Sequence, residues 1–245
     1  METNNNVLRL KDFDLKNAAE KRTCNEIIFR RVASKYNSIT RILSFYRDTA
    51  WKRRLAGRLP AVQGAVCLDL ACGTGDISFL LARKYSEGRI MAVDMSAEML
   101  SRAAALNKYE NIRFKQADMC RTGFAPGTFD VVTGGYALRN APDLGAVLKH
   151  VYMLLKPGGS ALFLDFAKSG YRSIRLLQLF LLRIWGGFWG LVLHGNPDLY
   201  AYIAESLALF PDISGLSRML TVYGFKKVKI KLLFWGMMSL VVCRK

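Results

Sequence analysis

The sequence predicts an α/β protein built on a doubly wound, mainly parallel sheet. Between residues 65 and 166, short apolar segments alternate with amphipathic segments of helical period. Such alternation indicates parallel strands with helices on both faces of the sheet. Of the 245 residues 51% are hydrophobic and 22% are charged, which excludes disorder by composition and provides a sizeable core.

The first 60 residues precede this alternation and are expected to form an N-terminal helical lid. Within residues 15–58, apolar side chains recur at intervals of three, four and seven, which is typical of helices, and Pro60 ends the region. The chain begins with a polar segment, METNNNVLRLKDFD, which lacks the apolar stretch of a secretory signal.

Residues 61–170 are expected to form the central core. Apolar segments predict five strands, at residues 65–70, 89–94, 111–118, 128–137 and 161–166. Amphipathic segments predict helices at residues 75–85, 96–107 and 142–155. Ser96 is suited to cap the second of these helices, and Pro142 favours the start of the third. An LKPGG turn (155–159) leads into the last strand.

Residues 171–245 are expected to complete the same domain with an apolar helix, further helices and a C-terminal β-hairpin. The segment 171–195 is strongly apolar, but its charges and glycines argue against a membrane span. On a helical wheel an arc of about 140° contains its main polar residues: Arg172, Arg175, Gln178 and Arg183. A helix in the membrane interface or over an apolar pocket, and a helix buried on the sheet, both stay open. Residues 226–245 predict two strands joined around Trp235 and Gly236.

The basic excess lies at the two ends of the sequence. The formal net charge is +17; residues 1–60 carry 14 Lys/Arg and 6 Asp/Glu, and residues 171–245 carry 10 and 3. Residues 61–170 are nearly balanced, with 12 and 10. Basic flanks fit an anionic membrane surface or nucleic acid, although such a charge also keeps an apolar protein soluble.

Cysteine and histidine usage argues against a disulfide scaffold and against a metal site. The five cysteines are scattered without a CxxC motif, and the chain has only two histidines. We therefore expect no metal and a reducing, cytosolic compartment.

A glycine-rich turn, CLDLACGTGDISF (67–79), lies between the first predicted strand and helix. Gly73 and Gly75 let the backbone approach a ligand closely, and the helix N-terminus offers free N–H groups. Dinucleotide enzymes place G-x-G-x-x-G here, but Ser78 stands where the third glycine or alanine belongs, which argues mildly against a pyrophosphate. No Gly-Lys-Ser/Thr follows, so the turn is not a Walker A loop.

Two carboxylates end neighbouring predicted strands. Asp94 ends the second strand, where a carboxylate can accept hydrogen bonds from both hydroxyls of a ribose. Asp118 ends the third strand, within reach of an adenine amino group. Alternatively, Asp94 caps the helix at 96–107 and Asp118 is a loop acid. Together with the LKPGG turn, these positions favour S-adenosylmethionine over NAD.

Five segments carry a more specific pattern: VASKYNSITRILSFYRDTAWKR (32–53), LDLACGTGD (68–76), FDVVTGGYALRNAPD (129–143), LLKPGGSALFLDFAKS (154–169) and NPDLYAYIAESLALFPD (196–212). In these segments the chain resembles a class I S-adenosylmethionine-dependent methyltransferase of the UbiE/COQ5/MenG family. The resemblance implies a seven-stranded, Rossmann-like sheet, with the cofactor bound by residues 61–170. It also implies C-methylation of a polyprenyl quinol ring: demethylmenaquinol to menaquinol, and for dual-function members the benzoquinol step of ubiquinone biosynthesis.

The resemblance implies a cofactor site made of Asp69, Gly73, Thr74, Gly75, Asp94, Met95, Asp118, Met119 and Gly135. The chain also departs from the family pattern. Gly135 replaces a serine, so a hydroxyl contact is lost there and only a backbone contact survives. Residues 36–41 read Tyr-Asn-Ser-Ile-Thr-Arg in place of Tyr-Asp-x-Met-Asn-Asp, and Asp48 occupies a His or Asp position. Because residues 36–41 and Asp48 lie in the expected lid, the differences there bear on which quinone is used.

The resemblance places Arg139 and Asn140 in the catalytic Leu-Arg-Asn element after the fourth strand. Because a guanidinium stays protonated, we expect Arg139 to stabilise a phenolate rather than act as a base. Asn140 would hold the ring or a water, and the proton would leave through water, Asp165 or Tyr136. The alternatives are an ion pair between Arg139 and Asp143, and a helix cap at Asn140.

We expect aromatic side chains and the apolar stretch 176–193 to cover the quinone ring and tail. The aromatic candidates are Tyr36, Trp51, Tyr136, Tyr200 and Tyr202. Each of them could instead belong to the hydrophobic core. A polyprenyl tail resides in the bilayer, so we expect a cytoplasmic enzyme on the inner face of the membrane, docked through its basic flanks. Nucleic acid is not expected, because Asn/Asp-Pro-Pro-Tyr/Phe and a Pro-Cys pair are missing. A homo-oligomer, and a related enzyme acting on another isoprenoid quinone or aromatic metabolite, stay open.

Overall fold

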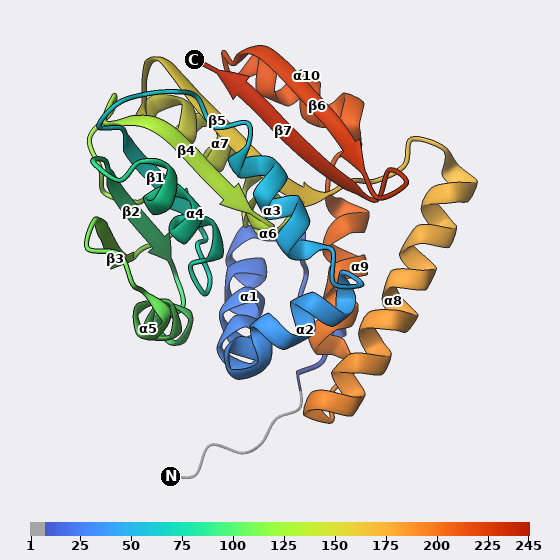
Figure 1. Ribbon diagram of the computed structural model, residues 1–245. Helices are drawn as coiled ribbons and strands as arrows, with labels where there is room; N and C mark the ends of the chain where they lie inside the picture. Colours follow the sequence, from blue (N-terminus) through green and yellow to red (C-terminus); the bar gives the residue numbers. More distant parts are fainter. Residues whose placement is uncertain (1–7) are drawn as a thin grey trace.

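The computed structural model describes residues 8–245, which form one seven-stranded sheet with helices on both faces (Figure 1). The strands are β1 (Val66–Leu70), β2 (Arg89–Asp94), β3 (Ile112–Gln116), β4 (Phe129–Gly135), β5 (Leu155–Phe166), β6 (Lys226–Leu233) and β7 (Met238–Arg244). Their order is β3-β2-β1-β4-β5-β7-β6; the first five are parallel, and β7 is antiparallel to both of its neighbours. The predicted fold class and the C-terminal hairpin are therefore confirmed.

The described helices follow the sequence pattern closely. They are α1 (Ala18–Val32), α2 (Tyr36–Leu43), α3 (Asp48–Ala56), α4 (Asp76–Lys84), α5 (Ala97–Leu106), α6 (Ala137–Asn140), α7 (Leu144–Leu154), α8 (Arg172–His194), α9 (Asp198–Leu209) and α10 (Ile213–Val222). Short 3₁₀ turns cover Leu10–Asp12 and Ala33–Lys35. As predicted, Ser96 caps α5 by accepting a hydrogen bond from the Met99 N–H. The polar start of the chain, residues 1–7, lies outside the described residues.

Three apolar clusters hold these layers together. On one face of the sheet, α7 and α10 pack against side chains such as Leu68 and Val132. On the other face, α3 and α4 pack against Cys67 and Val131. The third cluster joins α1, α2, α5 and α9 beyond the carboxyl ends of the parallel strands (Figure 1). In doubly wound sheets ligands bind at this end, where the strand order reverses, here between β1 and β4.

The structure differs from the sequence expectations in three places. The LKPGG segment is already part of β5 and forms a bulge in that strand. Gly158 has a positive φ of 79°, and the register with β4 shifts between Leu155 and Ser160. The chain leaves β4 at Tyr136 (φ 58°) and forms the one-turn helix α6, where the sequence predicted more strand. Helix α8 lies at the edge of the molecule against α9 (Figure 1), so a position buried on the sheet was the wrong alternative.

Candidate active site

The glycine-rich turn is fastened to the end of β2. Gly73 and Gly75 have positive φ angles of 54° and 89°, which glycine adopts without strain. Asp94 accepts hydrogen bonds from the Gly73 N–H (2.8 Å) and the Ser96 N–H (2.9 Å), and burial raises the pKa of its carboxyl group. Asp94 thus holds the turn and presents a carboxylate at its edge.

A small pocket of about 40 Å³ lies beside this turn. Among the residues expected to bind the cofactor, those that line it are Gly73, Asp94, Met95, Met119 and Gly135. A Cβ atom at position 135 would lie 2.6 Å from Ile77 Cδ1. Glycine, in place of the family's serine, therefore leaves room for the close packing of α4 at this position. Backbone at Gly73, a carboxylate at Asp94 and two thioethers suit the amino-acid end, the ribose and the adenine of S-adenosylmethionine.

Other expected cofactor residues support the pocket from outside. Asp69 accepts hydrogen bonds from Ser78 Oγ (2.6 Å) and Thr133 Oγ1 (2.8 Å), and burial raises its pKa to about 6. Asp69 therefore joins β1, β4 and α4 instead of facing the pocket. Gly75 is the N-terminal cap position of α4 and does not line the pocket either.

Thr74 and Asp118 contact the N-terminal helices. Thr74 Oγ1 donates a hydrogen bond to Asn37 Oδ1 (2.6 Å), so α2 is tied to the glycine-rich turn by one of the residues that departs from the family pattern. Asp118 forms an ion pair with Arg22 of α1 (2.5 Å) and accepts a hydrogen bond from the Cys120 N–H. These contacts are those of an acidic residue that stabilises a loop. Neither side chain lines the small pocket.

A second, larger cavity of about 450 Å³ adjoins the first. Every aromatic residue expected to contact substrate lines it: Tyr36, Trp51, Tyr136, Tyr200 and Tyr202. Arg139 and Asn140 also line it, and the remaining walls are mostly apolar side chains of α1, α2, α8 and the β6–β7 turn. A cavity with so few polar groups suits an apolar ring and tail.

Four residues line both cavities and form the wall between them: Phe29, Tyr36, Tyr136 and Asn140. A group passed from a molecule in one cavity to a molecule in the other must cross this wall. The polar groups available there are the two tyrosine hydroxyls and the side-chain amide of Asn140. These groups, more than Arg139, are placed to touch reacting atoms.

Asn140 has an acceptor atom without a partner. Its Nδ2 donates to Tyr136 O (2.8 Å), which fixes the orientation of the amide, and its backbone oxygen accepts from Asn25 Nδ2 (2.7 Å). Its Oδ1 is buried and has no hydrogen-bond partner among the described residues. Such an orphaned acceptor is costly, so it indicates a ligand donor. Asp143, not Asn140, caps α7.

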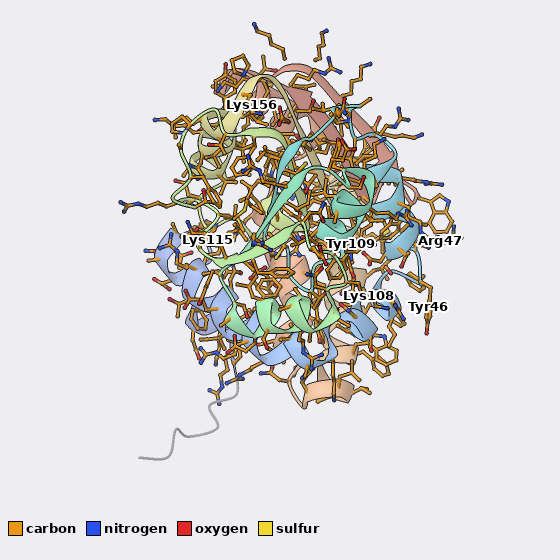
Figure 2. All side chains as sticks on the ribbon, turned by 60° about the vertical axis from the view of Figure 1, so that its left-hand side comes forward. Tyr46, Arg47, Lys108, Tyr109, Lys115 and Lys156 are labelled. Atoms are coloured by element: carbon orange, nitrogen blue, oxygen red, sulfur yellow. The ribbon has the colours of Figure 1, made fainter. Side chains whose placement is uncertain are left out.

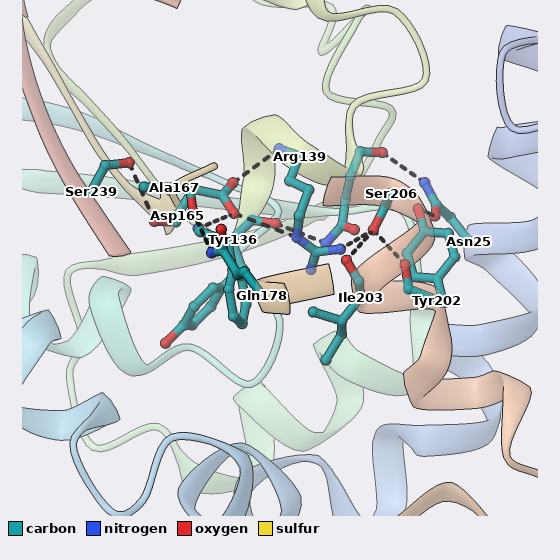
Figure 3. Close-up of polar contacts among 12 residues, drawn as sticks. Asn25, Tyr136, Arg139, Asp165, Ala167, Gln178, Tyr202, Ile203, Ser206 and Ser239 are labelled. Carbon is teal, nitrogen blue, oxygen red and sulfur yellow. Dashed lines mark hydrogen bonds and ion pairs between the residues drawn. The ribbon is translucent and has the colours of Figure 1, made fainter. Parts of the chain in front are cut away.

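Arg139 is held at the cavity wall between two elements (Figure 3). Its Nε lies 3.6 Å from Asp165 Oδ1, and its Nη1 donates to Ser206 Oγ of α9. The guanidinium is 4% exposed and lies 5.2 Å from the centre of the Phe166 ring. Burial raises the pKa of Asp165, and the charge of Arg139 opposes that shift. The alternative ion pair with Asp143 is not formed.

Tyr136 belongs to a buried polar chain that reaches the surface. Its hydroxyl donates to Asp48 Oδ1 (2.6 Å), and burial together with Asp48 raises the pKa of Tyr136 well above its usual value. Lys52 Nζ lies 2.7 Å from both Asp48 and Asp76, and the Asp76 side chain is 40% exposed. The left-handed backbone of Tyr136 is strained for a bulky residue, as is common at functional sites.

Several site residues were missed by sequence analysis. Ser206 falls inside the NPDLYAYIAESLALFPD segment, so its motif was visible while its contact with Arg139 was not. Lys21 donates to Arg139 O (3.0 Å), and burial and the charge of Arg139 lower its pKa to about 8. Lys21 and Asn25 lie on α1, where nothing in the local pattern distinguishes them.

The sheet order, the glycine-rich turn and the two adjoining cavities define a class I S-adenosylmethionine-dependent methyltransferase. Residues 16–245 match the ubiE/COQ5 methyltransferase family, and the chain belongs to that family. S-adenosylmethionine is accordingly its cofactor.

Curated relatives match along most of their length. The chain is 34% identical to a 2-phytyl-1,4-naphtoquinone methyltransferase of Thermosynechococcus vestitus, covering 90% of this chain and 98% of the relative. It is 32% identical to a demethylmenaquinone methyltransferase of Lactobacillus johnsonii (85% and 87% covered). It is 31% identical to the ubiquinone/menaquinone biosynthesis C-methyltransferase UbiE of Rickettsia prowazekii (87% and 89%).

Solved structures show the same fold at lower identity. A S-adenosylmethionine-dependent methyltransferase of Thermotoga maritima superposes with a TM-score of 0.66 at 14% identity, covering 89% of this chain and 98% of that one. A Haemonchus contortus N-methyltransferase in complex with S-adenosylhomocysteine gives 0.56 at 18%, covering 74% and 38%. At these identities the likeness concerns the fold alone.

Proposed function

We propose that the protein methylates a ring carbon of a polyprenyl quinol, with demethylmenaquinol as the first candidate substrate. The observation that carries this proposal is the apolar cavity of about 450 Å³ that shares a wall with the cofactor pocket and contains the orphaned Asn140 Oδ1. The naphthoquinone- and menaquinone-methylating relatives support the same substrate class. The UbiE relative supports the benzoquinol step of ubiquinone biosynthesis as a second candidate.

The polar groups favour the reduced ring. Asn140 Oδ1 is an acceptor, so it pairs with the hydroxyl of a quinol and repels the carbonyl oxygen of a quinone. In the proposed complex this hydrogen bond fixes the ring at the wall between the cavities. A ring carbon held there is oriented for attack, which is the main way in which an enzyme accelerates such a step.

The bound cofactor supplies an electrophilic methyl group to the ring carbon. The protein must make that carbon nucleophilic by favouring loss of a hydroxyl proton. Ionising a phenol with a pKa of about 10 at pH 7 costs roughly 4 kcal/mol. The buried guanidinium of Arg139 offsets much of this cost, since a fixed positive charge interacts strongly in a dry cavity.

Methylation of the ring releases one proton, and we propose Tyr136 as its first carrier. The quinol hydroxyl gives its proton to the Tyr136 oxygen while Tyr136 gives its own to Asp48, 2.6 Å away. When the methylated ring becomes aromatic again, the hydrogen of the methylated carbon leaves as a proton and the ring oxygen regains one, so that one proton is released in all. Asp48, Lys52 and Asp76 together carry a net charge of −1, so they can accept a proton and return it to water at Asp76. Arg139 and its partner Asp165 then act on the charge of the ring without taking the proton.

We also propose that residues 1–60 act as a lid over the cofactor. The small pocket of about 40 Å³ is far below the several hundred Å³ of ordinary ligand sites, so side chains from α1 and α2 must move for binding. The contacts that would break are Thr74 with Asn37 and Asp118 with Arg22. Residues 61–170 would then bind the cofactor, and residues 171–245 would cover the quinol.

The chemistry of the substrate implies the place of action. A polyprenyl quinol partitions into lipid, so we propose that the protein works in the cytoplasm at the inner, anionic face of the membrane and does not act on nucleic acid. The +17 net charge supports this partner. A homo-oligomer is compatible with the proposal and is not required by it.

Complementation tests the proposed function in a cell. The chain is expressed in a bacterium that makes both quinones and lacks its own quinone C-methyltransferase, and the lipid extract is analysed by mass spectrometry. Restored menaquinone is expected; restored ubiquinone in addition would identify a dual-function enzyme. A well-expressed protein that restores neither quinone would contradict the proposal and favour another isoprenoid or aromatic substrate.

A further inference from the structure

Helix α8 differs from an ordinary surface helix, because its buried side contains the polar Gln178 and two glycines while its solvent side is largely apolar. Gln178 is buried, donates to Ala167 O (2.7 Å) and accepts from the Ser169 N–H. Arg183, whose side chain is 67% exposed, lies at the border of this side and forms an ion pair with Glu205 of α9 (2.7 Å). Two glycines let α9 approach closely, since a Cβ at Gly186 would lie 2.5 Å from Tyr200 O.

The opposite side of α8 is apolar and faces outward. Its outward residues are 52–60% exposed: Ile174, Leu176, Leu177, Phe180, Leu181, Ile184, Phe188, Leu191 and Val192. On a helical wheel their mean direction is about 180° from that of the inward set. Soluble proteins seldom expose so large a contiguous apolar stripe, and such a patch marks an interaction surface.

Two aromatic turns continue this surface around the mouth of the large cavity. Phe45 (56% exposed) and Tyr46 (75%) form one turn, and Phe234 and Trp235 (92% exposed) form the tip of the β6–β7 hairpin. Phe45 stacks on Trp185 of α8, with ring centres 5.4 Å apart, and lies 6.0 Å from Phe234. All four turn residues have positive φ angles, which are unfavourable for aromatic side chains.

The mouth of the cavity opens between these elements. Leu181 and Ile184 on α8, Phe45 and Trp235 all line the cavity while being more than half exposed. Anything that covers the outer face of α8 therefore also covers the mouth. An apolar tail could pass between that cover and the cavity without crossing water.

The charges around this face are basic. No Asp or Glu occurs between residues 171 and 195, whereas Arg172 and Arg175 lie at the first turn of α8. Arg41 and Arg47 flank the first aromatic turn, and Figure 2 shows Tyr46 and Arg47 projecting together at the edge of the molecule. Lys229 and Lys231 are exposed on β6, next to the second turn. An apolar stripe with a basic border complements an anionic lipid surface.

We propose that the outer face of α8 and the two aromatic turns form one membrane-docking surface, which embeds in the anionic leaflet and opens the cavity to the lipid. This inference rests on the proposed function for the identity of the tail. Among residues 8–245, α8 alone is long and apolar enough to cross a membrane by length and composition. It lies in the interface instead, because Gln178 on its buried side and Arg183 at its border bind it to the rest of the protein.

Vesicle binding tests the docking surface without any catalysis. The full chain is floated with vesicles of phosphatidylglycerol and phosphatidylcholine, and with phosphatidylcholine alone. We expect binding to the anionic vesicles that weakens with salt. The variant Leu177→Glu with Phe180→Glu, two positions that do not line the cavity, is expected to bind at least about tenfold more weakly.

A matched variant controls for added charge. Leu106→Glu with Met153→Glu places the same two charges at apolar residues that are 50% and 41% exposed on α5 and α7, on the other side of the molecule in Figure 1. It should bind like the wild type. Brominated lipid should quench Trp235, and replacing Trp235 by phenylalanine should remove that part of the quenching.

Other results would overturn the proposal. Equal vesicle binding of both double variants would show that α8 is not the surface. A wild-type dimer that Leu177→Glu with Phe180→Glu turns into a monomer, without vesicle binding by either, would assign the face to a second copy. Resistance to extraction by alkaline carbonate would indicate a spanning helix. Methylation of a quinol without a polyprenyl tail should be equal in both variants, so failure of docking is distinguishable from failure of the proposed function.

Discussion

Replacing Arg139 by leucine separates its electrostatic role from its structural one. The guanidinium and Asp165 are buried side by side, 4% and 2% exposed. Removing one partner of a buried ion pair costs about 3–5 kcal/mol, because the other charge is left uncompensated. Asp165 still accepts hydrogen bonds from the Arg139 and Phe166 N–H groups, so we expect the lower end of that range. The paired variant Arg139→Leu with Asp165→Asn removes both charges and should recover most of the stability.

The rate should not recover with the stability. At about 5 Å and an effective dielectric constant of about 20, a unit charge stabilises a phenolate by roughly 3 kcal/mol, or about 10²-fold in rate. Both variants should therefore bind S-adenosylmethionine like the wild type and turn over about 10²-fold more slowly at pH 7. Their rates should rise about tenfold per pH unit towards pH 9, since the quinol must ionise without help.

The assay is single-turnover transfer of a labelled methyl group, with cofactor affinity measured by calorimetry and stability by urea unfolding. Turnover of the paired variant at the wild-type rate would refute the electrostatic role of Arg139. Loss of cofactor binding in the paired variant would instead assign Arg139 to the structure of the cofactor pocket.

Three further outcomes follow from the same contacts. Asn140→Leu should raise the KM for quinol about tenfold and should not weaken binding of the oxidised quinone, because the hydroxyl loses its acceptor whereas the carbonyl oxygen loses a repulsive contact; titration with both ring forms checks this. Between pH 4 and pH 8 the stability of Asp69→Asn relative to the wild type should rise by about 3 kcal/mol, because burial raises the pKa of Asp69 to about 6 and its ionised form is penalised as the pH rises from 4 to 6; melting curves at both pH values decide. Gly186→Ala should lower the melting temperature clearly, because the added Cβ would lie 2.5 Å from Tyr200 O; an unchanged melting curve would contradict the close packing of α8 on α9.

The parts of the site that are local in sequence could be predicted from it. The apolar strand β1, the glycines that follow it and the carboxylate at the end of β2 are neighbours along a βαβ unit, so their pattern predicts their place. The aromatic residues of α2, α3 and α9 were identified through family motifs, and they meet around one cavity. Ser96 and the hairpin around Trp235 follow from capping and turn rules.

Contacts between distant segments could not be predicted in this way. The ion pair of Asp118 with Arg22 and the bond of Thr74 to Asn37 depend on how α1 and α2 fold back over the sheet. Helix α6 is a single turn, too short for any periodicity to appear. The polar arc of α8 was visible in the sequence, yet only the structure shows that Gln178 is buried while Arg183 is an exposed partner of Glu205 on α9.

The most direct test of the central claim follows the methyl group itself. Purified protein is incubated with S-adenosylmethionine carrying a deuterated methyl group and with detergent-dispersed, reduced demethylmenaquinol and demethoxyubiquinol, and the products are analysed by mass spectrometry. We predict the deuterated methyl on a ring carbon of demethylmenaquinol, formed about 10²-fold more slowly by Arg139→Leu and about tenfold more slowly by Asn140→Leu at quinol concentrations below the KM. Cofactor binding without transfer to either quinol would contradict the proposed substrate, and the altered residues 37–41 of the lid would then be the place to seek another one.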